Sequence, residues 1–460
     1  MFRVKNRAEL ISNASSPISR KAREAALNAI EKALEAVDPR RLIKSRVNLS
    51  NKTLEINGLK LNLSSFRKIF VVGGGKAGGF MAEALESILG EWIEDGVVVV
   101  PKGTSSQYKT RRVRIHEASH PIPDEDSVDG VLKIMGLVED VRDSDLVICL
   151  ISGGGSSLMA MPRQGISLND KREITEMLLK SGANINEINT VRKHISEFKG
   201  GMLARRIYPA TLVSLILSDV VGDSLEVIAS GPTAPDPTTF RDAVNILERY
   251  RLWSKTPDSI REILLKGVNG LIPETPKPGD RVFEKTHNII IGNNRIACLA
   301  AAQELKNNGL NTLILTSLIE GEARNVGLML ASIAREASNS GNPIPKPAAI
   351  IVGGETTVTV TGSGIGGRNQ EAALSASLRI RGMENIVIAA VSTDGVDGPT
   401  DAAGAIADGE TGAKAEKLSL NPLDYLRNND SYTFFSKIGD LIFTGPTGTN
   451  VNDIIVTIIS

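Results

Sequence analysis

The chain has 460 residues, of which 41% are hydrophobic and 23% are charged. Its 53 basic and 53 acidic side chains give a formal net charge of +0 at pH 7, which removes the positive field that nucleic-acid-binding and membrane-surface proteins use. A chain of this length exceeds the size at which one hydrophobic core keeps growing, so two domains are expected.

The sequence predicts neither a targeting segment nor a membrane span. Its N-terminus lacks the apolar core of a signal peptide, and no run of about 18 apolar residues occurs. Cys149 and Cys298 stand in apolar surroundings without metal-site spacing, as expected of buried thiols in a reducing compartment. We therefore expect a cytoplasmic protein with small-molecule partners and with neither nucleic acid nor a membrane; a homodimer is left open.

The first predicted elements lie before residue 65. Apolar residues at helical spacing predict a helix over 15–38, which ends at Asp38-Pro39. Short strands are expected over 43–64, with Asn57-Gly58 as a hairpin turn. We expect the helix to pack on a lobe, which can be the C-terminal one, rather than to carry chemistry.

The stretch 67–85 is predicted to be a strand, a glycine turn and a helix. A β-branched run over 69–72 precedes three glycines and Lys76, and good helix formers follow. Glycines let backbone N–H groups approach an anion, and the helix adds its positive N-terminal end. A lysine at that end is unfavourable unless an anion arrives. Gly74, Gly75 and Lys76 are therefore candidates for anion binding.

Apolar runs that alternate with helices predict a parallel sheet in the first half. Strands are expected at 97–100, 113–116, 145–151 and 211–217, and helices near 126–141 and 169–181. Ligands of such sheets bind beyond the carboxyl ends of the strands. Two polar, glycine-bearing clusters fall there, namely Ser152-Gly153-Gly154-Gly155-Ser156-Ser157 and Ser218-Asp219-Val220-Val221-Gly222-Asp223.

A proline-rich region over 230–285, around a helix at 239–250, is predicted to be the domain boundary. It gives an N-terminal domain over 44–245 and a C-terminal domain over 246–460. A second alternating series follows, with strands at 288–291, 312–316, 348–352, 386–391 and 454–459 and a hairpin through Glu355 to Thr361. We expect two α/β domains: a Rossmann-like parallel sheet with helices on both faces, and a second domain with a mixed sheet.

The glycine turn could bind a small anion, as described above, or a dinucleotide. Gly73-x-Gly75-x-x-Gly78 matches the dinucleotide fingerprint. The next strand, however, ends in Pro101-Lys102-Gly103 without the acid that would hold a ribose hydroxyl. An NADP site with Lys102 on the extra phosphate stays as the weaker alternative.

Other motif matches lack the context that they require. The phosphate loop of nucleoside triphosphatases needs a different glycine spacing and a Ser or Thr where Ala77 stands. His116 and His120 have the spacing of a zinc protease, but they belong to a predicted strand and its following loop, so we interpret the match as coincidence.

Four acids lie just beyond predicted strands, in glycine-bearing loops: Asp219, Asp223, Asp394 and Asp397. Carboxylates in such positions suit Mg²⁺, and one of them could accept a proton from an attacking hydroxyl. Asp223 and Asp397 are explained equally well as turn formers. Arg368, which follows a glycine-rich loop, can clamp a carboxylate or phosphate.

These segments together resemble one family, the glycerate 2-kinases, also called the glycerate kinase type 2 family, with a MOFRL C-terminal domain. The motifs that carry the resemblance keep their order over nearly the whole chain; they begin at Val72, His120, Ile151, Leu217, Ala229, Gly353, Gly366 and Ser392. The resemblance implies transfer of the γ-phosphoryl group of ATP, with Mg²⁺, to the 2-hydroxyl of D-glycerate, giving 2-phosphoglycerate and ADP. It also implies an active site in the cleft between the two domains.

Members of the family were often labelled hydroxypyruvate reductases, so an NAD(P)H-dependent hydroxypyruvate reductase is the alternative. A protein that binds nucleotide without turnover is a third reading.

The resemblance also implies roles for individual residues. Lys76 and Arg368 would handle anions, and Asp219 and Asp394 would be essential carboxylates, as base or Mg²⁺ ligand, with Asp223 as a further metal candidate. We expect Lys76→Ala and Arg368→Ala to lower the rate while leaving the fold intact. Expected substrate- and nucleotide-binding residues are Gly74, Gly75, Ser152, Gly153, Gly154, Gly155, Ser156, Ser157, Asn293, Glu355, Gly367 and Asn369.

Overall fold

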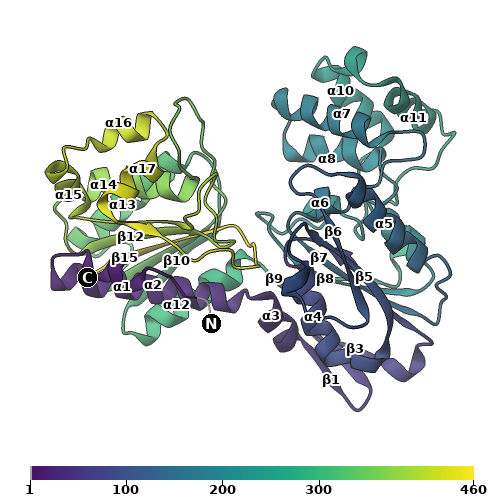
Figure 1. Cartoon of the computed structure of the whole chain (residues 1–460), viewed down its shortest axis with the longest axis horizontal. Helices are drawn as coiled ribbons and strands as arrows, with labels where there is room; N and C mark the ends of the chain where they lie inside the picture. Colours follow the sequence, from purple (N-terminus) through teal and green to yellow (C-terminus); the bar gives the residue numbers. More distant parts are fainter. Residues whose placement is uncertain (1–2) are drawn as a thin grey trace. The chain divides into compact units, whose positions relative to one another are not determined.

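The computed structural model describes residues 3–460. Its contacts divide the chain into two compact units, drawn in Figure 1. One unit is Pro39–Ile291, and the other joins the residues up to Asp38 with Gly292–Ser460. This division differs from the predicted domains over 44–245 and 246–460, since the segment 246–291 belongs to the first unit.

The unit Pro39–Ile291 is built on a six-stranded sheet of order β6-β5-β4-β7-β8-β9. Its strands are β4 (Ile69–Gly74), β5 (Ile93–Pro101), β6 (Val113–Ala118), β7 (Leu146–Ser152), β8 (Thr211–Leu217) and β9 (Thr286–Gly292). The pairs β4/β5, β5/β6, β4/β7 and β7/β8 are parallel. The predicted Rossmann-like sheet is therefore confirmed.

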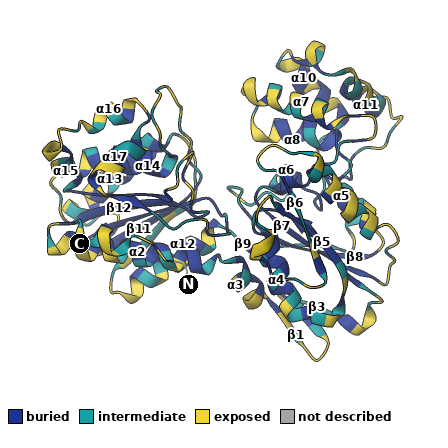
Figure 2. Cartoon of the chain, in the orientation of Figure 1, coloured by how far each residue is buried: buried dark blue, intermediate teal, exposed yellow. Residues whose placement is uncertain are grey.

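Helices cover both faces of this sheet. A Cβ built on Gly78 of α4 (Gly78–Leu89) would lie 3.0 Å from Val98, whereas one built on Gly130 of α5 (Glu125–Leu137) would lie 2.8 Å from Val99. Neighbouring residues of a strand point to opposite faces, so the two helices lie on opposite faces. Figure 2 shows the strands between them as buried.

A group of helices explains why the predicted boundary is wrong. It contains α7 (Leu168–Lys180), α8 (Ile185–His194), α10 (Phe240–Arg249) and α11 (Asp258–Val268). Their apolar side chains form one buried cluster, in which Val191 of α8 and Leu264 of α11 both take part. The proline-rich segment is thus a connection inside one unit, and β9 then extends its sheet.

A small antiparallel sheet completes this unit, next to α3 (Pro39–Arg46). Its strands are β1 (Val47–Ser50), β2 (Thr53–Ile56) and β3 (Leu59–Asn62). Asn57 and Gly58 connect β2 to β3 with φ of 50° and 92°, which is the backbone that the predicted hairpin turn needs.

The other unit has a mixed six-stranded sheet of order β10-β11-β15-β12-β13-β14, as predicted. Its strands are β10 (Asn311–Ile319), β11 (Ala348–Gly354), β12 (Ile386–Ser392), β13 (Gly404–Asp408), β14 (Leu441–Ile442) and β15 (Asp453–Ile459). Only β10/β11 is a parallel pair. The hairpin predicted through Glu355 to Thr361 is wrong, because this segment contains no strand and Thr357 only bridges to Glu322.

Two pairs of helices flank the mixed sheet on opposite sides in Figure 1: α2 (Pro17–Ala36) with α12 (Asn294–Asn307), and α13 (Ala323–Ser340) with α14 (Arg368–Ile380). Helix α2 begins where Ser16 accepts a hydrogen bond from the Ser19 amide, and it packs on α12, β12 and β15.

The remaining α-helices are α1 (Arg7–Ser12), α6 (Gly155–Leu158), α9 (Met202–Ile207), α15 (Thr411–Lys417), α16 (Pro422–Arg427) and α17 (Ser431–Ile438). Within residues 3–460, no helix combines the length and the apolar character that a membrane crossing needs.

Candidate functional site

The two glycine loops predicted to bind anions are interlocked. The Lys76 amide donates to the Gly153 carbonyl at 2.8 Å, and the Ala77 amide donates to Ser152 Oγ at 3.0 Å. A Cβ on Gly75, at φ of 134°, would lie 2.2 Å from that same Oγ. Gly75 is therefore needed for close contact between the loops after β4 and β7.

The side chain of Lys76 lies beside Gly154 and His120. A Cβ on Gly154 would come within 3.2 Å of Lys76 Cγ and 3.0 Å of the His120 ring. Gly154 has φ of 79°, so both its backbone and its surroundings favour glycine. The loop after β6 thus brings His120 to the edge of the sheet where Lys76 lies.

Asp219, which follows β8, lies against the same loop. A Cβ on Gly153 would be 2.2 Å from Asp219 Oδ2. Lys76, Gly153, Gly154 and Asp219 therefore lie at one edge of the sheet, because parallel strands bring their carboxyl ends together.

Ser156 connects this edge to the helical group. Its hydroxyl lies 2.9 Å from Ser230 Oγ, which donates to Asn189 Oδ1 at 3.0 Å. Ala229, Ser230 and Gly231 have φ of 51°, 61° and 62° in succession. Left-handed backbone at Ala229 and Ser230 is strained and is held only by its surroundings, as is common near functional sites.

Two further candidates have local structural roles. Asp223 has φ of 58°, and its amide closes a turn on the Val220 carbonyl at 3.0 Å. Asn293 caps α12, where its Oδ1 accepts from the Ile296 amide at 3.2 Å. These contacts agree with the turn-former interpretation of Asp223 and add a capping role for Asn293.

On the other unit, Arg368 is the first residue of α14 and is held by two carboxylates. Its Nε and Nη2 donate to the two Asp453 oxygens at 2.5 and 3.0 Å, and Nη1 lies 2.9 Å from Glu355 Oε1. Burial opposes the charged form, but Asp453 and Glu355 raise the pKa of the guanidinium. An incoming anion would have to compete with these partners.

The carboxylates around Arg368 crowd one another. Burial raises the pKa of Glu355 and that of Asp453, and the nearby Asp394 carboxylate adds to both shifts. Burial and the charge of Asp453 also raise the pKa of Asp397 to about 7. Negative charge here exceeds the charge that one guanidinium supplies, so a cation would be favoured.

Asp397 anchors the N-terminus of α14. Its oxygens accept from the Asn369 amide and side chain, each at 3.1 Å, and from the Gln370 amide at 2.9 Å. A Cβ on Gly367 would lie 2.2 Å from the Asp397 carboxyl carbon. Gly367 and Asn369 therefore help to shape the loop that carries Arg368.

Asp394 lies in the loop after β12. Its Oδ1 accepts from Ser392 Oγ at 2.8 Å and from the Val396 amide at 3.0 Å. Within residues 3–460, no cluster of three or more His, Cys, Asp or Glu side chains has metal-binding geometry. The metal assignments of Asp219, Asp223 and Asp394 stay predictions.

Sequence reasoning missed two residues of these groups. His120 begins one of the motifs that carry the family resemblance, but the sequence assigns it no role. It comes close to Lys76 only because the sheet places the loops after β4 and β6 at the same edge. Asp453 is separated by 85 positions from Arg368, to which it bonds. Its only sequence signal is a turn-rich approach through Thr449, Asn450 and Asn452 into a strand.

Family models cover both parts of the chain. A model described as a domain of unknown function, DUF4147, matches residues 25–265, and the MOFRL family model matches residues 348–453.

Similar proteins with names span nearly the whole chain. The chain is 45% identical to a glycerate 2-kinase from Pyrococcus horikoshii, over 95% of this chain and 97% of the relative. It is also 45% identical to a putative hydroxypyruvate reductase from Agrobacterium vitis, over 84% and 85%. A crystal structure of glycerate kinase from Thermotoga maritima superposes with a TM-score of 0.85 at 42% identity, covering 95% of this chain and 99% of that one. The chain therefore belongs to the glycerate 2-kinase family.

Proposed function

We propose that the protein transfers the γ-phosphoryl group of ATP to the 2-hydroxyl of D-glycerate, giving 2-phosphoglycerate and ADP. The observation that carries this proposal is the 45% identity to a glycerate 2-kinase over 95% of the chain. The gathering of Lys76, Gly153 and Asp219 at one sheet edge supports it, because phosphoryl transfer requires mainly alignment and positive charge around the transferring group.

Residues of both units are assigned to this reaction. Lys76 and Arg368 would bind the γ-phosphate or the glycerate carboxylate. Either Asp219 or Asp394 would accept the hydroxyl proton, and the other would hold Mg²⁺. Burial and the charge of Asp394 raise the pKa values of Glu355 and Asp453, which fits a site that gains a cation. When bound, Mg²⁺ would neutralise charge on the nucleotide phosphates.

The reductase alternative has a specific weakness at Lys102. Its amine lies 2.5 Å from Asp124 and 2.7 Å from Asp126. These two carboxylates neutralise the Lys102 charge that would have to bind the extra phosphate of NADP. Strand β5, which ends just before Lys102, also lacks an acid at its end that could bind a ribose hydroxyl. The reductase activity is therefore the less favoured function.

A coupled ADP assay with product identification tests the proposal. We expect ADP release that depends on both D-glycerate and Mg²⁺, with 2-phosphoglycerate rather than 3-phosphoglycerate as product. We expect Lys76→Ala to lower kcat by orders of magnitude, and Lys180→Ala, at an exposed position of α7, to leave it unchanged. No phosphorylation of glycerate with any nucleotide, or NAD(P)H oxidation with hydroxypyruvate instead, would exclude this function.

We further propose that the protein works in the cytoplasm on small molecules alone. Size-exclusion chromatography with light scattering would establish whether it is a homodimer.

A further inference from the structure

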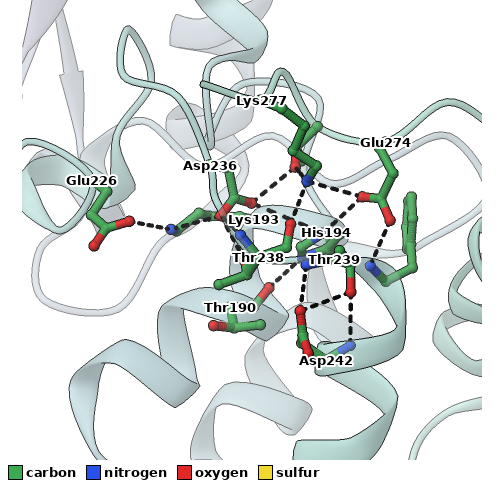
Figure 3. A network of polar contacts seen from close by, with 12 residues as sticks. Thr190, Lys193, His194, Glu226, Asp236, Thr238, Thr239, Asp242, Glu274 and Lys277 are labelled. Carbon is green, nitrogen blue, oxygen red and sulfur yellow. Dashed lines mark hydrogen bonds and ion pairs between the residues drawn. The ribbon is translucent and has the colours of Figure 1, made fainter. Parts of the chain in front are cut away.

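Two buried cations of the helical group, Lys193 and Arg163, have a carboxylate partner. Figure 3 shows the best example, where Lys193 Nζ lies 3.1 Å from Asp236 Oδ1 within a network that includes His194 and Glu274. Likewise, Arg163 Nε lies 3.8 Å from Glu197. Such pairing is expected, because a buried charge without a partner is costly.

Three cations of the same region depart from this pattern: Lys171 on α7, Arg192 on α8, and Lys199 beyond it. Among residues 3–460, no carboxylate forms an ion pair with any of them. Lys199 Nζ donates to the Ser156 carbonyl at 2.8 Å, and Arg192 Nη2 donates to the same oxygen at 3.4 Å. Two cations therefore converge on one atom of the loop after β7.

Lys171 is the most unusual of the three. Its residue is 4% exposed, and its Nζ has no hydrogen-bond partner among the described residues. Burial and the charge of Arg192 together lower the pKa of Lys171 to about 7, against an opposing attraction from Glu197. Burial also lowers the pKa of Lys199, with contributions from Arg192 and Lys171. The charges of Arg192 and Lys171 thus act on Lys199, and none of the three cations forms an ion pair with a carboxylate among the described residues; Glu197 attracts Lys171 without pairing with it.

The position of this group relates it to the candidate site. Ser156, whose carbonyl Arg192 and Lys199 hold, belongs to the loop that contains Gly153 and Gly154, beside Asp219 and Lys76. The Ser156 hydroxyl is hydrogen-bonded to Ser230 Oγ, and Ser230 in turn donates to Asn189 of α8, which ties this loop to the helical group.

We propose that Lys171 and Arg192, supported by Lys199, bind an oxyanion of a substrate at the Ser156 loop. The oxyanion is the carboxylate of the hydroxy acid or a phosphate of the nucleotide. This assignment rests on the proposed function and adds residues from the helical group to the predicted site. The bound anion supplies the ion-pair partner that these cations lack among the described residues.

Thermal unfolding of the full chain, without Mg²⁺ and therefore without turnover, tests this assignment. Inorganic phosphate, D-glycerate and ATP serve as separate probes. We expect at least one of them to raise the Tm of the wild type, because a ligand that binds only the folded state stabilises it. In Lys171→Met and Arg192→Gln, the Kd of that anion weakens about 10- to 100-fold, as expected for losing a charge-assisted hydrogen bond.

The variants also differ in the absence of an anion. Lys171→Met removes a buried amine without a partner, so its Tm without ligand equals or exceeds that of the wild type. Lys193→Met leaves the buried Asp236 carboxylate without its lysine partner. The Tm of this variant therefore falls, but the anion still raises that Tm. Lys180→Met, on the exposed face of α7, changes neither property.

The probes distinguish the source of the oxyanion. A response to D-glycerate lost in Lys171→Met assigns the carboxylate, and a response to ATP lost in this variant assigns the nucleotide phosphate. A wild type that responds to none of the three probes, or a Lys171→Met variant that binds them as the wild type does, overturns the proposal. A measured anion response with no kinase turnover would contradict the proposed function and leave this site standing.

Discussion

At Gly153, the absence of a side chain is what allows Asp219 to lie against the loop after β7. The substitution Gly153→Ala would bring a methyl group 2.2 Å from Asp219 Oδ2. The Asp219 carboxylate would have to move to make room, so the fold should lose about 1–3 kcal/mol.

The displaced carboxylate should nevertheless reduce the rate. We expect Gly153→Ala to lower kcat about 100-fold, because misplacing a reacting group by about 1 Å has this effect. Gly136→Ala is the matched control, since a Cβ there meets nothing within 4 Å. Steady-state kinetics together with urea unfolding measure both quantities. A Gly153→Ala enzyme with wild-type kcat would show that the position of Asp219 is unimportant.

The ion pairs of Arg368 change what its removal is expected to do. From the sequence, Arg368→Ala was expected to leave the fold intact. The side chain of Asp453 is 5% exposed and its two oxygens are held by Arg368. Arg368→Ala should therefore lower the free energy of unfolding by about 3 kcal/mol, since it leaves a buried charge without a partner.

A double substitution separates the structural role of Arg368 from its role in the reaction. We expect Asp453→Asn to restore the stability of Arg368→Ala, since it removes the stranded charge, but not to restore kcat. Urea unfolding and steady-state kinetics of the two single variants and the double variant complete the cycle. Recovery of kcat in the double variant would mean that Arg368 acts only through folding.

At the scale of the element, α8 shows what the sequence could and could not reveal. Its helical signal is complete, with Asn184 and Glu187 as a capping box and buried Ile188 and Val191 on one face. The local pattern cannot reveal which helix packs on α8, because 45 residues separate the end of α8 from the start of α10. The proline-rich segment after Ser230 therefore predicts a domain boundary where the structure has a connection inside one unit.

The strands that carry the site were predicted well for a physical reason. The apolar runs before Gly73, Ser152 and Asp219 are buried on both faces, which gives an unbroken hydrophobic signal. Parallel strands then bring their ends together whatever the detailed register. The partners of Arg368 escaped prediction because Asp453 reaches it through antiparallel pairing of a distant strand, β15.

The contacts between α8 and the segments around it predict a dependence on pH. Burial opposes ionisation of the Glu274 carboxyl. Hydrogen bonds with His194 and the Phe240 amide outweigh burial and lower the pKa of Glu274 to about 2. A carboxyl whose folded pKa is depressed stabilises the fold above its unfolded pKa of about 4.5. That contribution should be lost as the pH falls from about 4.5 towards 2.

Glu274→Gln isolates this contribution. The difference in urea midpoint between wild type and Glu274→Gln should be largest at pH 6 and should shrink as the pH falls towards 2.5. Glu173→Gln, at an exposed position of α7, should show no such trend. A constant difference across this range would mean that Glu274 acts through packing rather than through its charge.

At the scale of the whole molecule, the chain begins in one unit, forms the other unit over Pro39–Ile291, and then returns to the first. Helix α2, from the N-terminal segment, packs on α12, β12 and β15 of the C-terminal segment. Its Arg23 is fully buried between Asp408 at 2.7 Å and Asp440 at 2.5 Å. The segment after residue 291 therefore depends on the first 38 residues for one covering layer and for a cation that pairs with two buried acids.

This dependence predicts unequal behaviour of fragments. The fragment 39–291 contains its whole sheet up to β9 and its helical group, so it should unfold cooperatively by itself. The fragment 292–460 should not, because it exposes the face that α2 covers and leaves Asp408 and Asp440 without Arg23. Coexpression with residues 1–38 should restore a cooperative thermal transition.

Arg23→Met in the coexpressed N-terminal segment is the sharper comparison, since it keeps the apolar face of α2 and removes only the charge. We expect it to lower the stability of the reassembled unit by about 3–5 kcal/mol, the usual cost of breaking a buried ion pair. Circular dichroism in the near ultraviolet and thermal unfolding measure the result. If fragment 292–460 unfolds cooperatively without the N-terminal segment, α2 is an accessory to this unit rather than part of its core.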